Sequence, residues 1–406
     1  MKIAILGFGT VGQGVYKICQ EEKARYRARI GQDLDVKKVL VRDPDKDRGM
    51  DLPIGLLTSD IQEILEDPEI ELVVEVTSGK DQAISYIKQV LTSGKHLVSA
   101  NKVAIAADFK ELQELAAKKQ VHLKFEASVA AGIPILAPLV KLLAFNNIYK
   151  LHGIINSTTN YVLTEICQGK DLDQVLLAAR ELGILEEDPT DDLAGFDARR
   201  KLAILAMLIL DQEISEADIF SFGISQLDSR DTAILGALGY EIKLLAEFLK
   251  GREGGLTDGE YALSVLPTAL KNSKFNRVNG LFNEVALQGS QSGELRFLGA
   301  GGSMRPTANS IMTDILDVLT SKPTYHLLEN DSLVDISETR SSAYYIRLPG
   351  ELLSDRKLVK EVQNVAIEVL SDRDELAVFC RPLKPDQARQ LYGQGAHLVK
   401  LGETID

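Results

Sequence analysis

A short apolar segment that runs directly into a glycine-rich turn constrains the fold of this chain most strongly. Residues 2–6 are typical of a β-strand, and a helix with apolar Val11, Val15 and Ile18 follows the turn. The turn has the pattern G-x-G-x-x-G, whose glycines permit a tight turn, close backbone approach to a pyrophosphate, and close helix–strand packing. The amides and dipole of the helix N-terminus favour an anion at the same point. We therefore expect a dinucleotide to contact Gly7, Phe8, Gly9, Thr10, Val11 and Gly12.

Alternating strands and helices extend this pattern along the first third of the chain. Strand-like segments follow at residues 36–41, 72–76, 97–100 and 122–125, with helical segments at 82–91 and 108–118. This alternation predicts a Rossmann-type α/β fold with a doubly wound parallel sheet. Ligands of such sheets bind at the carboxyl ends of the strands. Residues at these ends are Thr77, Ser78, Asn101 and Lys102, which we expect near the cofactor.

The residue after the second strand bears on cofactor choice. An acid there accepts from the ribose 2′-hydroxyl of NAD, whereas an arginine pairs with the 2′-phosphate of NADP. The strand ends at Arg42-Asp43, so the arginine favours NADP(H). A solvated arginine before an Asp-Pro turn is the alternative, and Asp43 keeps NAD(H) open.

Composition narrows the class of protein. The 406 residues suit two or three domains, and the formal net charge of −13 opposes binding to nucleic acid or an anionic membrane. A small-molecule ligand fits better. The chain starts without a signal-peptide pattern and has no apolar run of spanning length, so we expect a cytoplasmic protein. Cys19, Cys167 and Cys380 are not spaced for zinc or a redox pair, and we expect them reduced and buried.

Residues 183–201 carry the clearest chemical signal. Pro189 and Gly195 predict a loop rich in carboxylates, and residues 198–210 are apolar enough for a buried helix. Asp197 and Lys201 stand at i and i+4 and so project from one helix face. A lysine that enters an apolar region beside a carboxylate can be tuned to hold and release a proton. An N-cap acid with an ordinary salt bridge is the alternative, and the pair alone leaves both open.

The whole stretch resembles the signature of homoserine dehydrogenases. The matching positions are Ala179, Gly183, Asp188, Pro189, Asp192, Gly195, Asp197 and Lys201. The resemblance implies that Lys201 is the proton donor and acceptor, and that Glu186, Asp192 and Asp197 hold the substrate or orient the lysine. Ile184 and Leu185 depart from the family's tyrosine and small residue, which bears on packing beside the substrate.

The resemblance extends to two segments of the first third. It implies that Lys102 lies by the nicotinamide and the substrate. Residues 126–134 resemble the family's hinge, which implies a sodium ion held by Glu126, Val129, Ala131 and Ile133. Ala131 replaces the usual glycine, so a left-handed backbone there would be strained.

Polar residues also follow a strand predicted at 148–156. The run Asn-Ser-Thr-Thr-Asn at 156–160 suits the charged groups of an amino acid, with Asn156 and Thr158 as candidate contacts. A plain helix cap is equally natural there. In the family this run has a glycine where Ser157 stands. The resemblance also implies that the glycine-rich turn containing Gly301 lies near the cofactor.

The remaining chain predicts further α+β structure. Leu235, Leu238, Ile242, Leu245 and Leu249 form one stripe, which predicts a single long helix over residues 228–249. Strands are expected at 261–266, 283–287 and 294–298, and a helix around 311–319. Residues 343–406 have the order βαββαβ of a ferredoxin-like domain. It resembles the ACT domain that ends many homoserine dehydrogenases, which implies an assembly role or an amino-acid effector such as L-threonine.

These patterns divide the chain into domains. We expect an NAD(P)-binding Rossmann domain at 1–133, completed by a helix at 306–320, and a substrate-binding catalytic domain at 134–305. A linker at 321–342 and an ACT-like domain at 343–406 follow.

The resemblance implies interconversion of L-aspartate 4-semialdehyde and L-homoserine with NAD(P)H, in threonine, methionine and isoleucine biosynthesis, by a homodimer or a dimer of dimers. Hydride reaches the aldehyde carbon, charge develops on oxygen, and a lysine delivers the proton. One alternative is a dehydrogenase of the same fold for another small semialdehyde or amino alcohol, suggested by Ile184, Leu185 and Ser157. The other is a non-catalytic amino-acid or cofactor sensor, which would not need Lys201.

Overall fold

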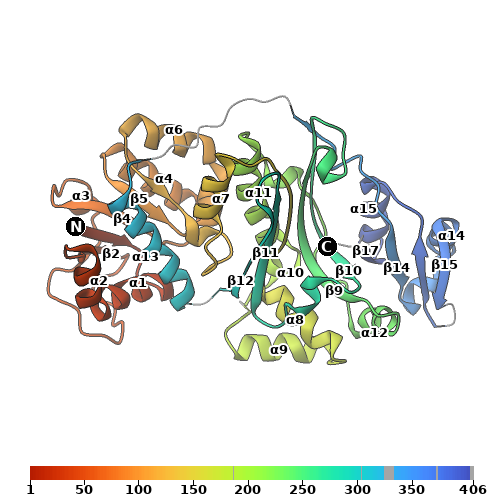
Figure 1. Ribbon diagram of the computed structural model, residues 1–406. Coiled ribbons are helices and arrows are strands. Elements are labelled where there is room, and N and C mark those ends of the chain that lie inside the picture. The colour runs from red at the N-terminus through yellow and green to blue at the C-terminus, as the bar shows by residue number, and fades with distance from the viewer. Residues whose placement is uncertain (186, 303, 324–332, 372–373, 403–406) are drawn as a thin grey trace. The chain divides into compact units, whose positions relative to one another are not determined.

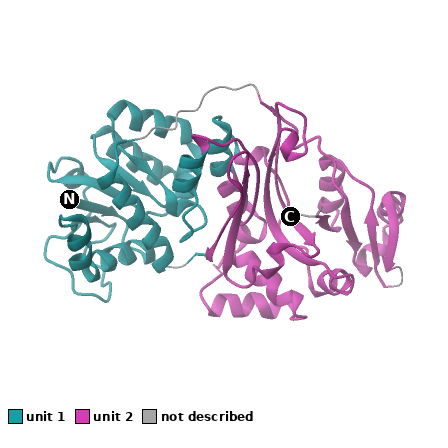
Figure 2. Cartoon of the chain, in the orientation of Figure 1, with its two compact units in different colours: residues 1–142, 203–215, 300–331 teal, residues 143–202, 216–299, 332–406 magenta. Residues whose placement is uncertain are grey.

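The chain forms two compact units, each assembled from separate parts of the sequence. The computed structural model describes residues 1–185, 187–302, 304–323, 333–371 and 374–402. The first unit consists of residues 1–142, 203–215 and 300–331, and the second of residues 143–202, 216–299 and 332–406 (Figures 1 and 2).

The first unit is built on a parallel six-stranded sheet with the order β3-β2-β1-β4-β5-β6. Its strands are β1 (Lys2–Leu6), β2 (Asp35–Leu40), β3 (Leu57–Thr58), β4 (Ile70–Glu75), β5 (His96–Ser99) and β6 (Leu123–Lys124). Residues 3–6 and 72–75 are buried, as expected for central parallel strands covered on both faces. The predicted Rossmann-type sheet is confirmed, and β3 was not predicted.

Helices cover both faces of this sheet (Figure 1). They are α1 (Thr10–Glu21), α2 (Lys23–Ile30), α3 (Gln62–Leu65), α4 (Lys80–Thr92), α5 (Lys102–Ala107), α6 (Phe109–Lys119), α7 (Leu136–Leu143) and α13 (Met304–Thr320). α13 packs on α1, and its Ile311 and Ile315 join Ile3 and Ile5 in one core. A Cβ on Gly14 of α1 would lie 2.9 Å from the Met304 side chain, so glycine permits this close approach. A segment from late in the chain thus completes the core around β1.

The second unit contains a mixed sheet with the order β12-β11-β7-β9-β10-β17-β14-β16-β15, and β8 and β13 also pair with β10. The strands are β7 (Ile148–Ile154), β8 (Phe220–Ser221), β9 (Glu241–Lys250), β10 (Glu260–Leu270), β11 (Phe282–Gly289), β12 (Gly293–Ala300), β13 (Val334–Asp335), β14 (Tyr344–Leu348), β15 (Ala366–Ser371), β16 (Leu376–Cys380) and β17 (His397–Leu401). The helices are α8 (Ser157–Cys167), α9 (Leu172–Glu181), α10 (Thr190–Leu193), α12 (Ser229–Ala237), α14 (Arg356–Val365) and α15 (Pro385–Gly393). A further helix, α11 (Phe196–Leu210), belongs to this unit up to Leu202 and to the first unit from Ala203.

The single helix predicted over residues 228–249 is wrong. α12 ends at Ala237, Gly239 has φ +83°, and β9 begins at Glu241. A left-handed glycine is a common end of a helix. Residues 242–249 of β9 are all buried, so both faces of the strand are covered, and Ile242, Leu245 and Leu249 also fit the spacing of a helix.

The C-terminal segment forms a four-stranded part of the second sheet. β15 and β16, the two consecutive strands of the predicted order βαββαβ, pair in antiparallel fashion. β17 pairs in parallel with β10 through Thr268 and Ala269, so this part continues the sheet that starts at β12. Nothing in the sequence indicated this pairing. Part of residues 321–342 also joins the sheet, because β13 pairs with β10.

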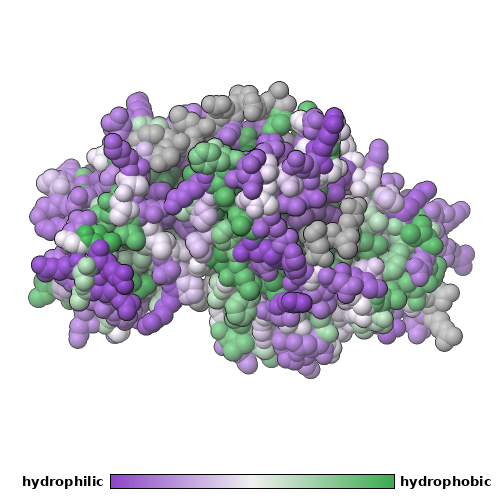
Figure 3. Space-filling model, viewed as in Figure 1, coloured by the Kyte–Doolittle hydropathy of each residue, from purple (hydrophilic) through white to green (hydrophobic). Residues whose placement is uncertain are grey.

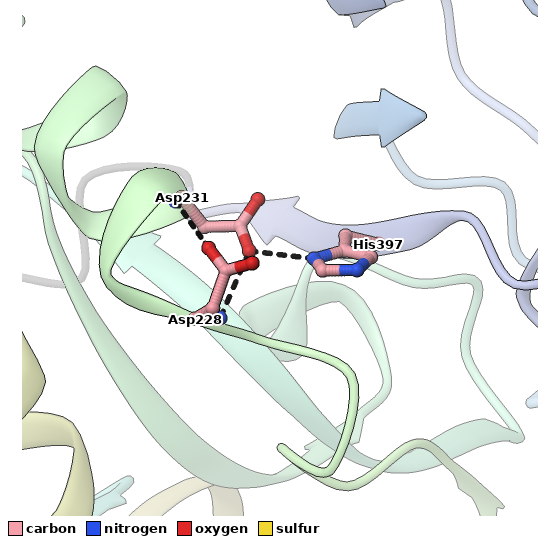
Figure 4. Close-up of side chains that lie close together, drawn as sticks. All are labelled: Asp228, Asp231 and His397. Carbon is pink, nitrogen blue, oxygen red and sulfur yellow. Dashed lines mark hydrogen bonds and ion pairs between the residues drawn. The ribbon is translucent and has the colours of Figure 1, made fainter. Parts of the chain in front are cut away.

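A buried ion network attaches the C-terminal strands to α12. Arg347 on β14 donates to both carboxylate oxygens of Asp231, at 2.7 and 2.9 Å, and to Asp228 at 2.6 Å. Burial opposes the charge of Asp231, but hydrogen bonds with Arg347 and His397 lower its pKa to about 2. Asp228, Asp231 and His397 come together as metal ligands do (Figure 4). Here the guanidinium of Arg347 already supplies the positive charge.

Leu281, Phe282 and Leu298 are exposed at or beside the β11–β12 edge, where Figure 3 shows a band of hydrophobic surface.

Cys19 and Cys380 are buried, whereas Cys167 is exposed, which corrects the expectation for that cysteine. Within the described residues, no helix combines the length and the apolar character needed to cross a membrane.

The turn before α7 yields a stability prediction. Ala131 has φ +51° and Ala130 has φ +54°, which confirms a left-handed backbone where the family has glycine. Ala131→Gly should raise the free energy of unfolding by about 1 kcal/mol because glycine relieves the steric cost of this conformation. Urea unfolding measures the change. The control Ala117→Gly, inside α6, should lower stability, and a lower stability for Ala131→Gly as well would contradict the prediction.

Candidate functional site

The first group of site residues lies around Lys201 in the second unit. Its ammonium donates to the carbonyl of Ile155 at 2.8 Å and pairs with Asp197 at 2.7 Å. Asp197 lies in the first turn of α11 and is buried, while Lys201 is half-buried one turn later. The predicted i,i+4 pair is therefore present, and its lysine also binds the carbonyl of the residue directly after β7.

Asn156 connects this pair to a second carboxylate. Its amide nitrogen donates to Asp192 at 2.7 Å and to Asp197 at 2.9 Å. Its amide oxygen accepts from the backbone amide and the hydroxyl of Thr159, at 2.8 and 2.9 Å, and so caps α8. Asn156 is thus both a helix cap and a polar site residue, so the two interpretations of residues 156–160 are compatible.

Short local structures place Asp192. Asp188 accepts from the amide and hydroxyl of Thr190, at 3.0 and 2.6 Å, at the start of α10, and these bonds lower the pKa of Asp188. α10 then presents Asp192 to Asn156. The hydroxyl of Thr158 donates to the carbonyl of Ile184 at 3.3 Å. Glu186 lies outside the described residues.

This group has the chemistry to hold a small amino acid. Asp192 and Asp197 offer carboxylate oxygens to an ammonium group, and the start of α8 offers amides to an anion. Lys201 adds a group that gives or takes a proton.

The second group lies in the first unit, at the turn between β1 and α1. Gly7 has φ +97°, and a Cβ there would lie 2.7 Å from the carbonyl oxygen of Val76. A Cβ on Gly12 would lie 2.2 Å from the carbonyl oxygen of Gly7, whereas one on Gly9 would meet open space. No side chain caps α1, so its first amides can bind a phosphate. The turn fits the pyrophosphate of a dinucleotide.

The ends of β4 and β5 are tied together beside this turn. Buried Glu75 accepts from the Thr77 amide at 2.8 Å and from the Ser99 hydroxyl at 2.7 Å, and burial raises its pKa. Asn101 donates to the carbonyl of Thr77 at 3.2 Å and caps α5, whose first residue is Lys102. The structure thus brings Thr77, Asn101 and Lys102 to one sheet edge, together with Ser78. Sequence reasoning missed Glu75, although an acid that ends an apolar strand could have indicated it.

Arg42 lies at the carboxyl end of β2 and has no ion-pair partner in the described part of the chain. The carboxylate of Asp43 accepts from the amide of Asp45 at 3.0 Å, so it is engaged in a turn. Gly301 is buried between β12 and α13.

The proposed cation residues surround the turn before α7. The carboxylate of Glu126 accepts from the amides of residues 135–137 at 2.6 to 2.8 Å and so caps α7. Glu126 can therefore offer a cation its main-chain carbonyl. Val129, Ala131 and Ile133 can offer theirs as well. The carbonyl of Ala131 already accepts from the hydroxyl of Ser310 at 2.6 Å.

Comparison with known proteins identifies the family. The family model described as homoserine dehydrogenase, NAD binding domain matches residues 7–126, and the model described as homoserine dehydrogenase matches residues 134–316. The chain is 38% identical over 321 residues to the homoserine dehydrogenase of Bacillus subtilis, which covers 79% of this chain and 73% of the relative. The chain belongs to the homoserine dehydrogenase family.

Solved structures of the homoserine dehydrogenase family agree. A homoserine dehydrogenase from Thiobacillus denitrificans has a TM-score of 0.85 and 29% identity, covering 99% of this chain and 98% of that one. A hyperthermophilic archaeal homoserine dehydrogenase in complex with NADPH has a TM-score of 0.63 and 27% identity, covering 80% and 99%. The chain is therefore an oxidoreductase that acts on a CH–OH group with a nicotinamide cofactor, and the alternative of a non-catalytic sensor is not supported.

Proposed function

We propose that the chain interconverts L-aspartate 4-semialdehyde and L-homoserine, in the pathway to threonine, methionine and isoleucine, with Lys201 as proton donor and acceptor. The observation that supports this most is the double donation of Asn156 to Asp192 and Asp197, because it aligns two carboxylates with the lysine. The nicotinamide, when bound, supplies or accepts the hydride.

Each polar residue of the site then has a role. Lys201 holds a proton at the alkoxide oxygen, and Asp197 keeps its ammonium charged and oriented. Asp192 and Glu186 bind the substrate ammonium, and Thr158 contributes to substrate contacts. Lys102 adds positive charge beside the developing alkoxide.

For the cofactor we propose a preference for NADP(H). The guanidinium of Arg42 would pair with the 2′-phosphate. The carboxylate of Asp43 is engaged in a turn with Asp45, and Arg42 is exposed beside it. The phosphates would bind the β1–α1 turn, and Thr77, Ser78 and Asn101 would line the nicotinamide side. We further propose a sodium ion at the carbonyls of residues 126–133.

We also propose that the enzyme is a cytoplasmic homodimer or dimer of dimers. Three free cysteines suit a reducing compartment. The exposed apolar residues beside β12, which is an edge strand, suit contact with a second copy. The C-terminal strand order β17-β14-β16-β15 suits the proposed ACT-like domain at 343–406, with a role in assembly or in binding an effector such as L-threonine.

A second candidate is the same chemistry on a different small semialdehyde or amino alcohol. Two residues that depart from the family pattern favour it, because they lie next to a candidate substrate contact. Leu185 is buried, and the carbonyl of Ile184 accepts from the hydroxyl of Thr158. Steady-state rates on a panel of such substrates separate the two candidates.

The proposed role of Lys201 predicts a specific loss. Lys201→Ala should reduce turnover of L-homoserine to background because the proton acceptor is lost, while NADPH binding stays within about twofold since the change is local. Absorbance of reduced nicotinamide measures turnover, and fluorescence titration measures binding. The exposed control Lys170→Ala should keep full activity. Turnover by Lys201→Ala at the wild-type rate would remove Lys201 from the mechanism.

The proposed role of Arg42 concerns only the cofactor. Arg42→Ala should lower kcat/KM for NADP by about tenfold, the value of one charged hydrogen bond, and leave that for NAD nearly unchanged. Arg48→Ala is the control, because Arg48 bonds backbone carbonyls of the same loop. Equal losses with both cofactors would contradict a 2′-phosphate contact.

A further inference from the structure

A polar hollow of about 550 Å³ lies in the second unit, and its lining includes neither Lys201 nor its partners Asp197 and Ile155. Strands β7, β9, β11 and β12 contribute to it from one part of the sheet, and β17 and residues 340–343 contribute from the other. Four permanent cations line it against two carboxylates, although the chain as a whole has a net charge of −13. The cations are Lys150, Arg296, Arg340 and Lys400, and the carboxylates are Glu247 and Glu294.

The carboxylate of Glu247 organises one side of the hollow. One of its oxygens accepts from both Arg340 and Lys400, each at 2.8 Å, and the other lies 3.3 Å from the imidazole of His152. Burial opposes the charge of Glu247, but these neighbours hold its pKa well below the ordinary range. Glu247 is therefore ionised, and two permanent cations share a single negative charge.

The donors of these cations are only partly used. An ammonium has three donors and a guanidinium has five. Among the described residues, Glu247 is the side-chain partner of both Lys400 and Arg340, and Lys400 is 8% exposed. Arg340 and Lys400 therefore have donors beyond those that Glu247 uses, and these donors can bind an anion in the hollow.

Arg296 lines the hollow on the β12 side. Its Nε donates to Glu284, its Nη1 lies 3.5 Å from a carboxylate oxygen of Glu294, and its Nη2 is buried without a hydrogen-bond partner in the described part of the chain. The guanidinium stacks over Phe275 at 4.4 Å, which fixes its orientation. Glu284, Glu294 and Phe275 thus hold the guanidinium of Arg296 in place beside the hollow.

We propose that this hollow is a binding site for a small anion with two or more carboxylates. The cations stand on separate elements, Lys150 on β7, Arg296 on β12 and Lys400 on β17, whereas phosphate sites gather amides at one helix N-terminus or glycine turn. Spread-out cations suit an anion whose charges are also spread out. Leu249, Leu287 and Leu401 in the lining suit its methylene groups.

Binding there has a structural consequence. The ligand would contact both the sheet of residues 148–300 and the C-terminal strand β17. The bound ligand would therefore stabilise the pairing of β10 with β17, and the more so the larger the fraction of sites that are occupied.

Calorimetric titration of the full chain with citrate and with succinate tests the proposal. We expect one saturable site per chain, and about tenfold weaker binding in Arg340→Gln and in Lys150→Gln, because each loses one charged hydrogen bond. The matched controls Arg356→Gln and Lys360→Gln, exposed on α14, should bind as the wild type does. Saturating L-homoserine and NADPH should leave citrate binding unchanged, which separates this site from the active site.

Several outcomes would overturn the proposal. These are no saturable binding of citrate or succinate, equal binding by the hollow and control variants, and inorganic phosphate binding as tightly as citrate. Lys150 has no side-chain partner in the described residues, so Lys150→Gln keeps the test valid if loss of the Arg340 ion pair unfolds that variant. If citrate fails to bind and Arg340→Gln changes the sedimentation coefficient, the hollow accommodates a second copy of the chain instead.

Discussion

The amide of Asn156 is the interaction on which the active centre depends. One side chain caps α8, restrains Asp192 from α10 and restrains Asp197 from α11. Two carboxylates so close together would repel each other, and a neutral donor between them lowers that cost without neutralising either. Asp197 then remains a charged partner for Lys201. Two hydrogen bonds from Asn156 thus hold α10 and the start of α11 beside the end of β7.

The same principle operates in the first unit. Glu75 is buried at the end of β4 and accepts from Thr77, in the loop after β4, and from Ser99, the last residue of β5. Asn101 adds a bond to the carbonyl of Thr77 and starts α5. In both units, a buried polar side chain at a strand end fixes the loops that carry the candidate site residues.

Sequence patterns predicted the parts of the structure that depend on local chemistry. The β1–α1 turn, the Asp197–Lys201 pair and the order βαββαβ were all readable, because glycine spacing, helical period and strand period are local signals. Residues 228–249 were read wrongly because β9 is buried on both faces and its apolar residues Ile242, Leu245 and Leu249 also fit helical spacing. The pairing of β17 with β10 and the role of Glu75 depend on contacts between distant segments, so no local pattern reports them. The site residues identified by resemblance remain proposals in their roles, although the structure brings Asn156, Asp192, Asp197 and Lys201 together.

We propose that Lys201, paired with Asp197, handles the proton, and the pH dependence of kcat/KM for L-homoserine oxidation is the measurement that tests this role. The wild type and Asp197→Asn are to be compared over the same pH range. Asp197→Asn should shift the midpoint of the profile to lower pH, because loss of the carboxylate 2.7 Å from the ammonium makes the lysine easier to deprotonate. An active Asp197→Asn enzyme with an unchanged midpoint would contradict this role of Lys201.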